Sequence, residues 1–81
     1  MIWLETQNSD LIECSMIRLV MISPIQYILQ NQNGYPLIEV RSREEAIAIK
    51  DKIKEHISNG LISVLDLNKL LMEIRRVKAN G

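Results

Sequence analysis

The fold is decided by the stretch Glu39-Val40-Arg41-Ser42-Arg43-Glu44-Glu45-Ala46, in which strand chemistry gives way to helix chemistry. Upstream of it, apolar residues tend to alternate with polar ones, and downstream of it they recur at helical spacing. Ser42 and Glu45 have the spacing of a capping box, in which each side chain accepts a hydrogen bond from the other residue's backbone N–H. The stretch therefore predicts strands over residues 1–40 and a first helix over residues 42–59.

Four apolar runs in the first part of the chain predict strands, over residues 1–6, 11–22, 25–30 and 35–40. The second run is long for a single strand, and we expect a bulge or bend near Ser15. Asn33 and Gly34 predict a tight hairpin turn, because both residue types tolerate positive φ values. The sequence thus predicts an α+β fold: an antiparallel meander of three or four strands packed by one helix, followed by a C-terminal helix.

A second helix is predicted over residues 63–78, within a chain that forms one domain over residues 1–81. Either Ser63 or Asp66 can serve as its N-cap, because both side chains accept hydrogen bonds from free backbone N–H groups. The segment Leu61–Leu65 can be a short strand or a linker, and the sequence leaves both open. The apolar residues of this helix form one stripe at helical spacing: Leu67, Leu70, Leu71, Ile74 and Val77.

Composition narrows the class of protein. Hydrophobic residues make up 47% of the chain, which is enough for a packed interior and too many for a disordered segment. No apolar run approaches the length of a membrane helix, and the first residues lack the pattern of a signal peptide. Cys14 is the single cysteine, so no intrachain disulfide can form. We therefore expect a cytoplasmic protein in a reducing compartment, with no membrane as partner.

The formal net charge is zero, but the two halves of the chain differ in sign. Residues 1–40 carry four acidic residues and one basic residue, a net charge of −3. Residues 41–81 carry six acidic and nine basic residues, a net charge of +3. A non-specific nucleic-acid binder usually has a strongly basic footprint, so nucleic acid is not expected as a partner. The opposite halves can instead attract a second copy or another protein.

Residues of the types used in catalysis occur without the partners that catalysis needs. His56 has no carboxylate or cysteine at helical spacing, and Cys14 has no neighbouring cation that would lower the pKa of its thiol. Glu44 and Glu45 stand in the first turn of the first helix, where acidic residues stabilise the helix dipole. No glycine-rich phosphate loop is present in the sequence. We predict that the protein is not an enzyme and that it uses no metal and no cofactor.

Five arginines and two tyrosines are the candidates for binding a small anion: Arg18, Arg41, Arg43, Arg75, Arg76, Tyr27 and Tyr35. Arg41 and Arg43 flank a helix N-terminus, where guanidinium and free N–H groups can bind a phosphate or carboxylate. Glu44 and Glu45 compete for the same position. The two tyrosines can stack on a base, and they equally suit core packing or an interface. One candidate function is therefore sequestration of an anionic molecule, such as a nucleotide signal, at an oligomer interface.

Surplus apolar surface predicts self-association. Both faces of the middle strands are at least half apolar, and one helix can cover only one of them. A symmetric homodimer buries such a surplus with a single patch on each copy. We expect the stripe on the second helix to lie at or near that interface: Leu67, Leu70, Leu71 and Ile74.

A short first strand containing Trp3, then a hairpin, then Ser42-Arg43-Glu44-Glu45-Ala46 leading into an Ile-rich helix make up a broader pattern. This pattern, over Met1 to Ser58, resembles small uncharacterised strand-rich proteins of bacterial and phage genomes. The resemblance carries no functional residue and implies accessory roles, including inhibition of host defence by binding a protein or sequestering a small signal. The favoured function is a non-enzymatic protein-interaction module, acting as a homo-oligomer with a further protein partner.

Overall fold

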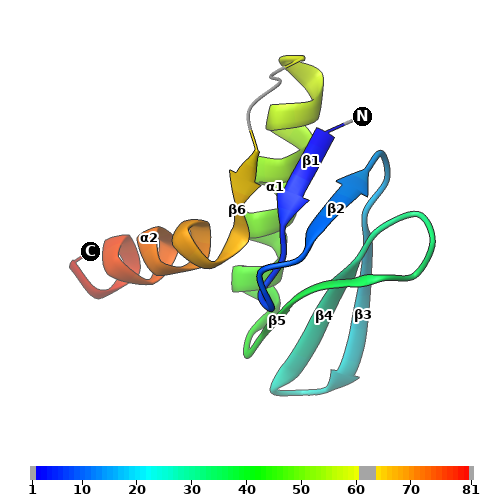
Figure 1. Cartoon of the computed structure of the whole chain (residues 1–81). Coiled ribbons are helices and arrows are strands. Elements are labelled where there is room, and N and C mark those ends of the chain that lie inside the picture. Colours follow the sequence, from blue (N-terminus) through cyan, green and yellow to red (C-terminus); the bar gives the residue numbers. More distant parts are fainter. Residues whose placement is uncertain (1, 61–63, 81) are drawn as a thin grey trace.

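We describe the fold from a computed structural model, which defines residues 2–60 and 64–80, the side chains of 78–80 excepted. This part of the chain forms two three-stranded sheets and two helices (Figure 1). Sheet A has the order β2 (Leu11–Cys14), β1 (Ile2–Glu5), β6 (Leu65–Asp66). Sheet B has the order β3 (Arg18–Ser23), β4 (Gln26–Gln30), β5 (Pro36–Val40). The helices are α1 (Arg43–Ser58) and α2 (Leu67–Asn80), and the predicted α+β class is confirmed.

The long second run of the sequence forms two strands that belong to different sheets. β2 ends at Cys14 and β3 begins at Arg18, so the bend expected near Ser15 carries the chain from sheet A to sheet B. Sheet B is the antiparallel meander, and β1 pairs antiparallel with β2 and parallel with β6. The bend allows residues on both sides of it, such as Cys14 and Leu29, to point into one shared core.

The core lies between the two sheets and the helices. α1 packs against β4 and β5, and the start of α2 packs against α1, β1 and β5. Fourteen buried apolar residues form one cluster, which includes Leu4 of β1, Leu29 of β4, Val40 of β5, Ile49 of α1 and Leu67 of α2. Every one of these five side chains is at most 1% exposed, so both sheets and both helices contribute to the same core.

α1 begins and ends as its sequence predicts. The Ser42 hydroxyl accepts a hydrogen bond from the backbone N–H of Glu45 at 3.1 Å, and the Glu45 carboxylate accepts one from the backbone N–H of Arg41 at 3.4 Å. Asn59 is the C-cap, and Gly60 follows with a φ of +62°, the left-handed conformation that glycine adopts without strain.

The segment before α2 combines a short strand with a cap. Leu65 and Asp66 pair parallel with Leu4 and Glu5, and the Asp66 carboxylate accepts a hydrogen bond from the backbone N–H of Lys69 at 3.1 Å. The other predicted cap, Ser63, lies outside the described residues, as do residues 61 and 62. From Asp66, α2 projects away from the two sheets, so that its far turns have little beneath them (Figure 1).

The connection between β4 and β5 is a hairpin, but its turn is wider than predicted. Residues 31–35 form the loop, and Gly34 takes a positive φ of +79° whereas Asn33 does not. The loop is organised by Asn31, whose side-chain oxygen accepts hydrogen bonds from the backbone N–H groups of Asn33 and Tyr35 at 3.0 and 2.9 Å. The connection is therefore a wider loop held by hydrogen bonds to the Asn31 side chain, in place of the tight turn expected from Asn33 and Gly34.

Candidate functional site

The candidate site is a strand edge, because the outer edge of a sheet presents backbone N–H and C=O groups that another strand can pair with. Three strands of the described chain have such an edge over four or more residues: β2 in sheet A, and β3 and β5 in sheet B. The three edges differ in what occupies them. That difference identifies the surface that is available to a partner.

The edge of β5 is occupied by the chain itself. The backbone N–H of Gln7 donates to the carbonyl of Leu37 at 2.9 Å, and the Gln7 side-chain oxygen accepts from the backbone N–H of Glu39 at 3.0 Å. Pro36 begins the strand without an N–H to offer, and α2 packs beside it. Gln7 therefore fills the place of a neighbouring strand.

Two amide side chains of the 31–35 loop occupy the edge of β2. Asn31 donates from its side-chain nitrogen to the carbonyl of Glu13 at 3.1 Å, and the Gln32 side-chain oxygen accepts from the backbone N–H of Ser15 at 3.0 Å. Asn31 is only 6% exposed, so its hydrogen bonds are shielded from water. The loop of sheet B thereby covers the C-terminal end of this edge of sheet A, whereas Leu11 at its start is exposed.

β3 is different, because its outer edge is open. Its ladder runs to β4 alone, and among the described residues we find no hydrogen bond from another element to its outer side. Its residues Arg18-Leu19-Val20-Met21-Ile22-Ser23 include one charge, at the start, and one irregularity of pairing, between Met21 and Ser23. Charges, prolines and bulges are the usual means of blunting an edge, and most of β3 has none of them.

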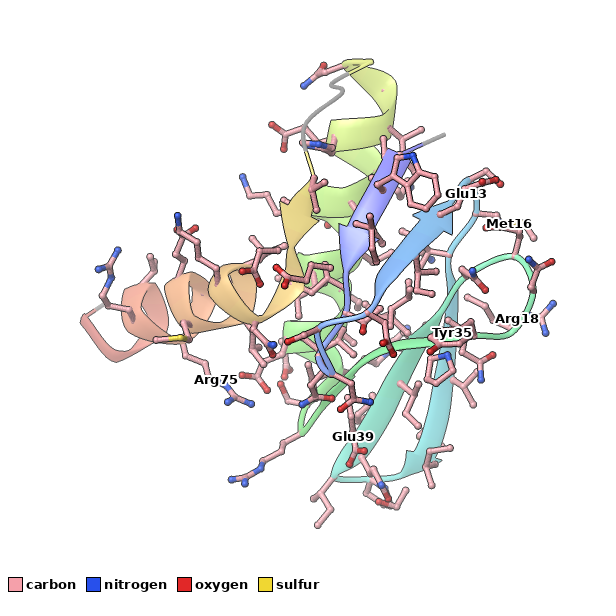
Figure 2. The ribbon with its side chains drawn as sticks, viewed as in Figure 1. Glu13, Met16, Arg18, Tyr35, Glu39 and Arg75 are labelled. Atoms are coloured by element: carbon pink, nitrogen blue, oxygen red, sulfur yellow. The ribbon has the colours of Figure 1, made fainter. Side chains whose placement is uncertain are left out.

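Apolar side chains surround this open edge, because α1 covers β4 and β5 but stops short of β3. Tyr27 of β4 is 8% exposed, whereas its cross-strand partner Met21 is 64% exposed. Met16 before the strand, Ile22 within it and Ile25 after it are also exposed. Met16 and Arg18 lie at the right of the view in Figure 2, where β3 begins. We call residues 16–25 the β3 edge.

Most of the apolar stripe predicted on the second helix packs against the core of the same chain. Leu67, Leu70 and Leu71 are buried in the core, and Ile74 is half-buried against it. These side chains therefore offer little surface to another molecule. Two apolar side chains of the described part of α2 are exposed: Met72, on the other face, and Val77, which continues the stripe into the far turns of the helix. Self-association stays a prediction, and the β3 edge is better placed for it than the stripe.

Two of the predicted arginines lie together. Arg41 and Arg75 line one hollow of about 270 Å³, together with Gln7 and Glu39. The Arg75 Nε donates to the Glu45 carboxylate at 2.7 Å, a hydrogen bond that raises the pKa of the Arg75 guanidinium. Because two carboxylates accompany the two guanidinium groups, the hollow has little net charge with which to attract an anion.

The remaining predicted ligand residues are dispersed. Tyr27 is buried, and Tyr35 lines a different hollow, of about 360 Å³, beside Trp3. The Tyr35 hydroxyl donates to the Asp10 carboxylate at 2.9 Å, and this hydrogen bond raises the pKa of Tyr35. Of the other arginines, Arg18 begins β3, Arg43 begins α1 and Arg76 lies on α2. The hollow lined by Tyr35 and the hollow lined by Arg41 and Arg75 are thus separate.

Cys14 has the environment of a core residue. It is fully buried, and burial raises the pKa of its thiol, which also donates to the carbonyl of Met16 at 3.5 Å. A thiol held in its protonated form is a poor nucleophile. In residues 2–60 and 64–80 we find no group of three or more histidine, cysteine, aspartate or glutamate residues arranged to hold a metal ion.

No family model, curated protein or solved structure matches the chain. Neither described helix has the length and apolar character needed to cross a membrane. Sequence reasoning located β3 and its apolar residues but missed Gln7, Asn31 and Gln32, the amide side chains that occupy the other edges. A signal for Asn31 does exist, since asparagine at the start of a turn often hydrogen-bonds the backbone two residues further on.

Proposed function

We propose that the protein is a non-enzymatic protein-interaction module that binds an extended segment of its partner along the β3 edge. The observation that supports this is the open, apolar edge of β3 in a fold whose other two long edges are bonded by side chains, along β5 and at the end of β2. An added strand gains main-chain hydrogen bonds for affinity and alternating side-chain contacts for specificity. A role as an accessory or inhibitor protein fits binding without chemistry.

The composition of the β3 edge defines the partner segment. Val20 and Ile22 alternate with Leu19 and Met21, so both faces of the added strand would meet apolar side chains. Arg18 is the one charge of the strand and favours an acidic residue at the matching end of the segment. The expected partner segment is therefore extended and largely apolar, with an acidic residue at one end.

Capture from a lysate of the source cell tests this function with matched variants. Val20→Lys places a charge in the middle of the β3 edge, and Met72→Lys places the same charge on α2, where Met72 is 72% exposed. We expect a stoichiometric protein that the wild type and Met72→Lys both retain and that Val20→Lys loses. A partner retained equally by all three proteins would overturn the assignment of the β3 edge.

A second candidate is a protein that sequesters a small anion, because Arg41 and Arg75 do line one hollow. The same capture experiment tests this second candidate if the small molecules released from the purified protein are also analysed by mass spectrometry. A nucleotide or other phosphate compound that disappears in Arg41→Ala would support this candidate. A wild-type protein that releases no anion would leave the interaction module as the remaining proposal.

A further inference from the structure

We infer that the strand that occupies the β3 edge in the isolated protein is β3 of a second copy, paired antiparallel about a two-fold axis. This inference rests on the proposed function and names what covers the same edge when no other protein is bound to it. The two copies of sheet B would then form one continuous six-stranded sheet, twice the three strands of each copy. The open edge would disappear from both copies at once.

The occupied edges explain why the second copy would present β3 and not another strand. An open chain of molecules would need β3 of one copy to pair with β5 or β2 of the next. Gln7 occupies the edge of β5, and Asn31 and Gln32 occupy the C-terminal end of the edge of β2. β3 is the one long edge along which we find no hydrogen bond from another element among the described residues, so pairing of β3 with β3 closes with two copies.

Side-chain alternation restricts the register. Residues directly opposite each other in an antiparallel pair lie on the same face of the sheet. Val20 lies opposite Ile28 on the outer face of sheet B, and Leu19 lies opposite the buried Leu29 on the inner face. A two-fold axis normal to the sheet preserves these faces. One residue of β3 must therefore stand opposite the same residue of the partner subunit, with the axis midway between the two strands.

An axis midway between the two copies of Val20 uses the regular part of the strand. It pairs Val20 with Val20 of the partner subunit, Leu19 with Met21 of the partner subunit, and Arg18 with Ile22 of the partner subunit. The irregularity between Met21 and Ser23 stays at the end of the paired segment. No like charges stand opposite each other, because Arg18 is the only charged residue of the strand.

The exposed side chains of the edge support this pairing. Met21 projects from the inner face beyond the cover of α1, and Ile22 projects from the outer face. Beside a second β3, each would lie against the side chains of the other copy. Removing such exposed apolar surface from water on both sides of the sheet is favourable and adds to the main-chain hydrogen bonds.

The oligomeric state of the whole chain tests the pairing. We expect a dimer by sedimentation or light scattering at about 100 μM, and about 100-fold weaker self-association in Val20→Lys, because two ammonium groups would meet at the axis. Met72→Lys should leave the dimer unchanged. A wild-type monomer, or a folded Val20→Lys that dimerises normally, would overturn the inference.

Two further variants locate the contact. Ile28→Lys changes the same outer face of sheet B on the neighbouring strand β4, and it should preserve the dimer. Loss of the dimer in this variant would indicate that the two copies pack through the outer faces of their sheets and not edge to edge. Val20→Cys should form a disulfide between copies on mild oxidation, because opposed Cα atoms about 4.5–5.5 Å apart are within reach of one. The buried Cys14 should not cross-link. A disulfide through Met21→Cys in place of Val20→Cys would overturn the register.

The two proposals fail in different ways. A monomeric wild type that still loses its lysate partner in Val20→Lys would overturn self-pairing and leave the interaction function supported. A dimer that dissociates in Val20→Lys supports self-pairing. If that dimer captures no partner through the edge, the proposed binding of another protein fails while the self-pairing stands.

Discussion

β3 and β5 are the two outer strands of the same sheet, and they meet their surroundings in opposite ways. β5 begins with Pro36 and hydrogen-bonds to Gln7 through Leu37 and Glu39. β3 has no such partner among the described residues, and four exposed apolar side chains surround it: Met16, Met21, Ile22 and Ile25. One glutamine can therefore end a sheet that would otherwise continue.

Both edges are bonded by side-chain amides, at β5 together with the backbone N–H of Gln7. A side-chain amide carries a donor and an acceptor in a geometry close to that of the peptide group, so it can occupy the place of a strand without extending the sheet. Gln7 serves β5, and Asn31 and Gln32 serve β2. The comparison can be tested by opening the protected edges.

Asn31→Ala should have the largest effect. It removes a buried side chain that makes hydrogen bonds to Glu13, Asn33 and Tyr35, and leaves their backbone groups without those partners. We expect a loss of about 3 kcal/mol in the free energy of unfolding, measured with urea. Asn33→Ala, at an exposed position of the same loop, is the control and should stay within about 0.5 kcal/mol of the wild type.

Gln7→Ala should have an intermediate effect on stability and a distinct effect on assembly. The backbone hydrogen bond from Gln7 to Leu37 remains, and the hydrogen bond to the backbone N–H of Glu39 is lost. We expect about 1 kcal/mol less stability and the appearance of species larger than the wild-type assembly in light scattering. An unchanged size distribution would show that the side chain of Gln7 does not protect the edge.

Tyr35→Phe should have the smallest effect, visible in its dependence on pH. The hydrogen bond to Asp10 raises the pKa of Tyr35 in the folded state above its unfolded value of about 10. A raised pKa gives a stabilisation that is complete below about pH 10 and is lost as the pH rises through the folded pKa. The stability difference between the two proteins should therefore be constant from about pH 7 to 9 and shrink above about pH 10. A difference that stays constant through this range would contradict the assignment.

Local chemistry explains what the sequence predicted well. The cap formed by Ser42 and Glu45, the bend near Ser15 and the cap at Asp66 each depend on residues a few positions apart. Interactions of this range are encoded in short stretches of chain, so residue type and spacing suffice to predict them. The division of the strands between two sheets depends on distant pairings and could not be read in this way.

The candidate site depended on distant contacts and was predicted only in part. The apolar residues of β3 were apparent from their alternation, but an open edge is defined by what other residues fail to cover. Asn31 reaches Glu13 across 18 positions, and Gln7 reaches Glu39 across 32. The apolar stripe of α2 has the same period whether it packs inside the chain, as Leu67 does, or against a partner.

The position of β1 between β2 and β6 has a consequence for the order of folding. Leu4 pairs with Leu65, so sheet A requires closure of a loop that spans most of the chain, whereas sheet B joins neighbouring segments. Closing a long loop is slower than closing a short one. Pulsed hydrogen exchange during refolding should protect the amides of β4 before those of β6, and the reverse order would contradict this expectation. On the ribosome, β1 can pair with β2 early but must wait for β6, which is made after sheet B and α1, so the meander with its open edge can form before sheet A is complete.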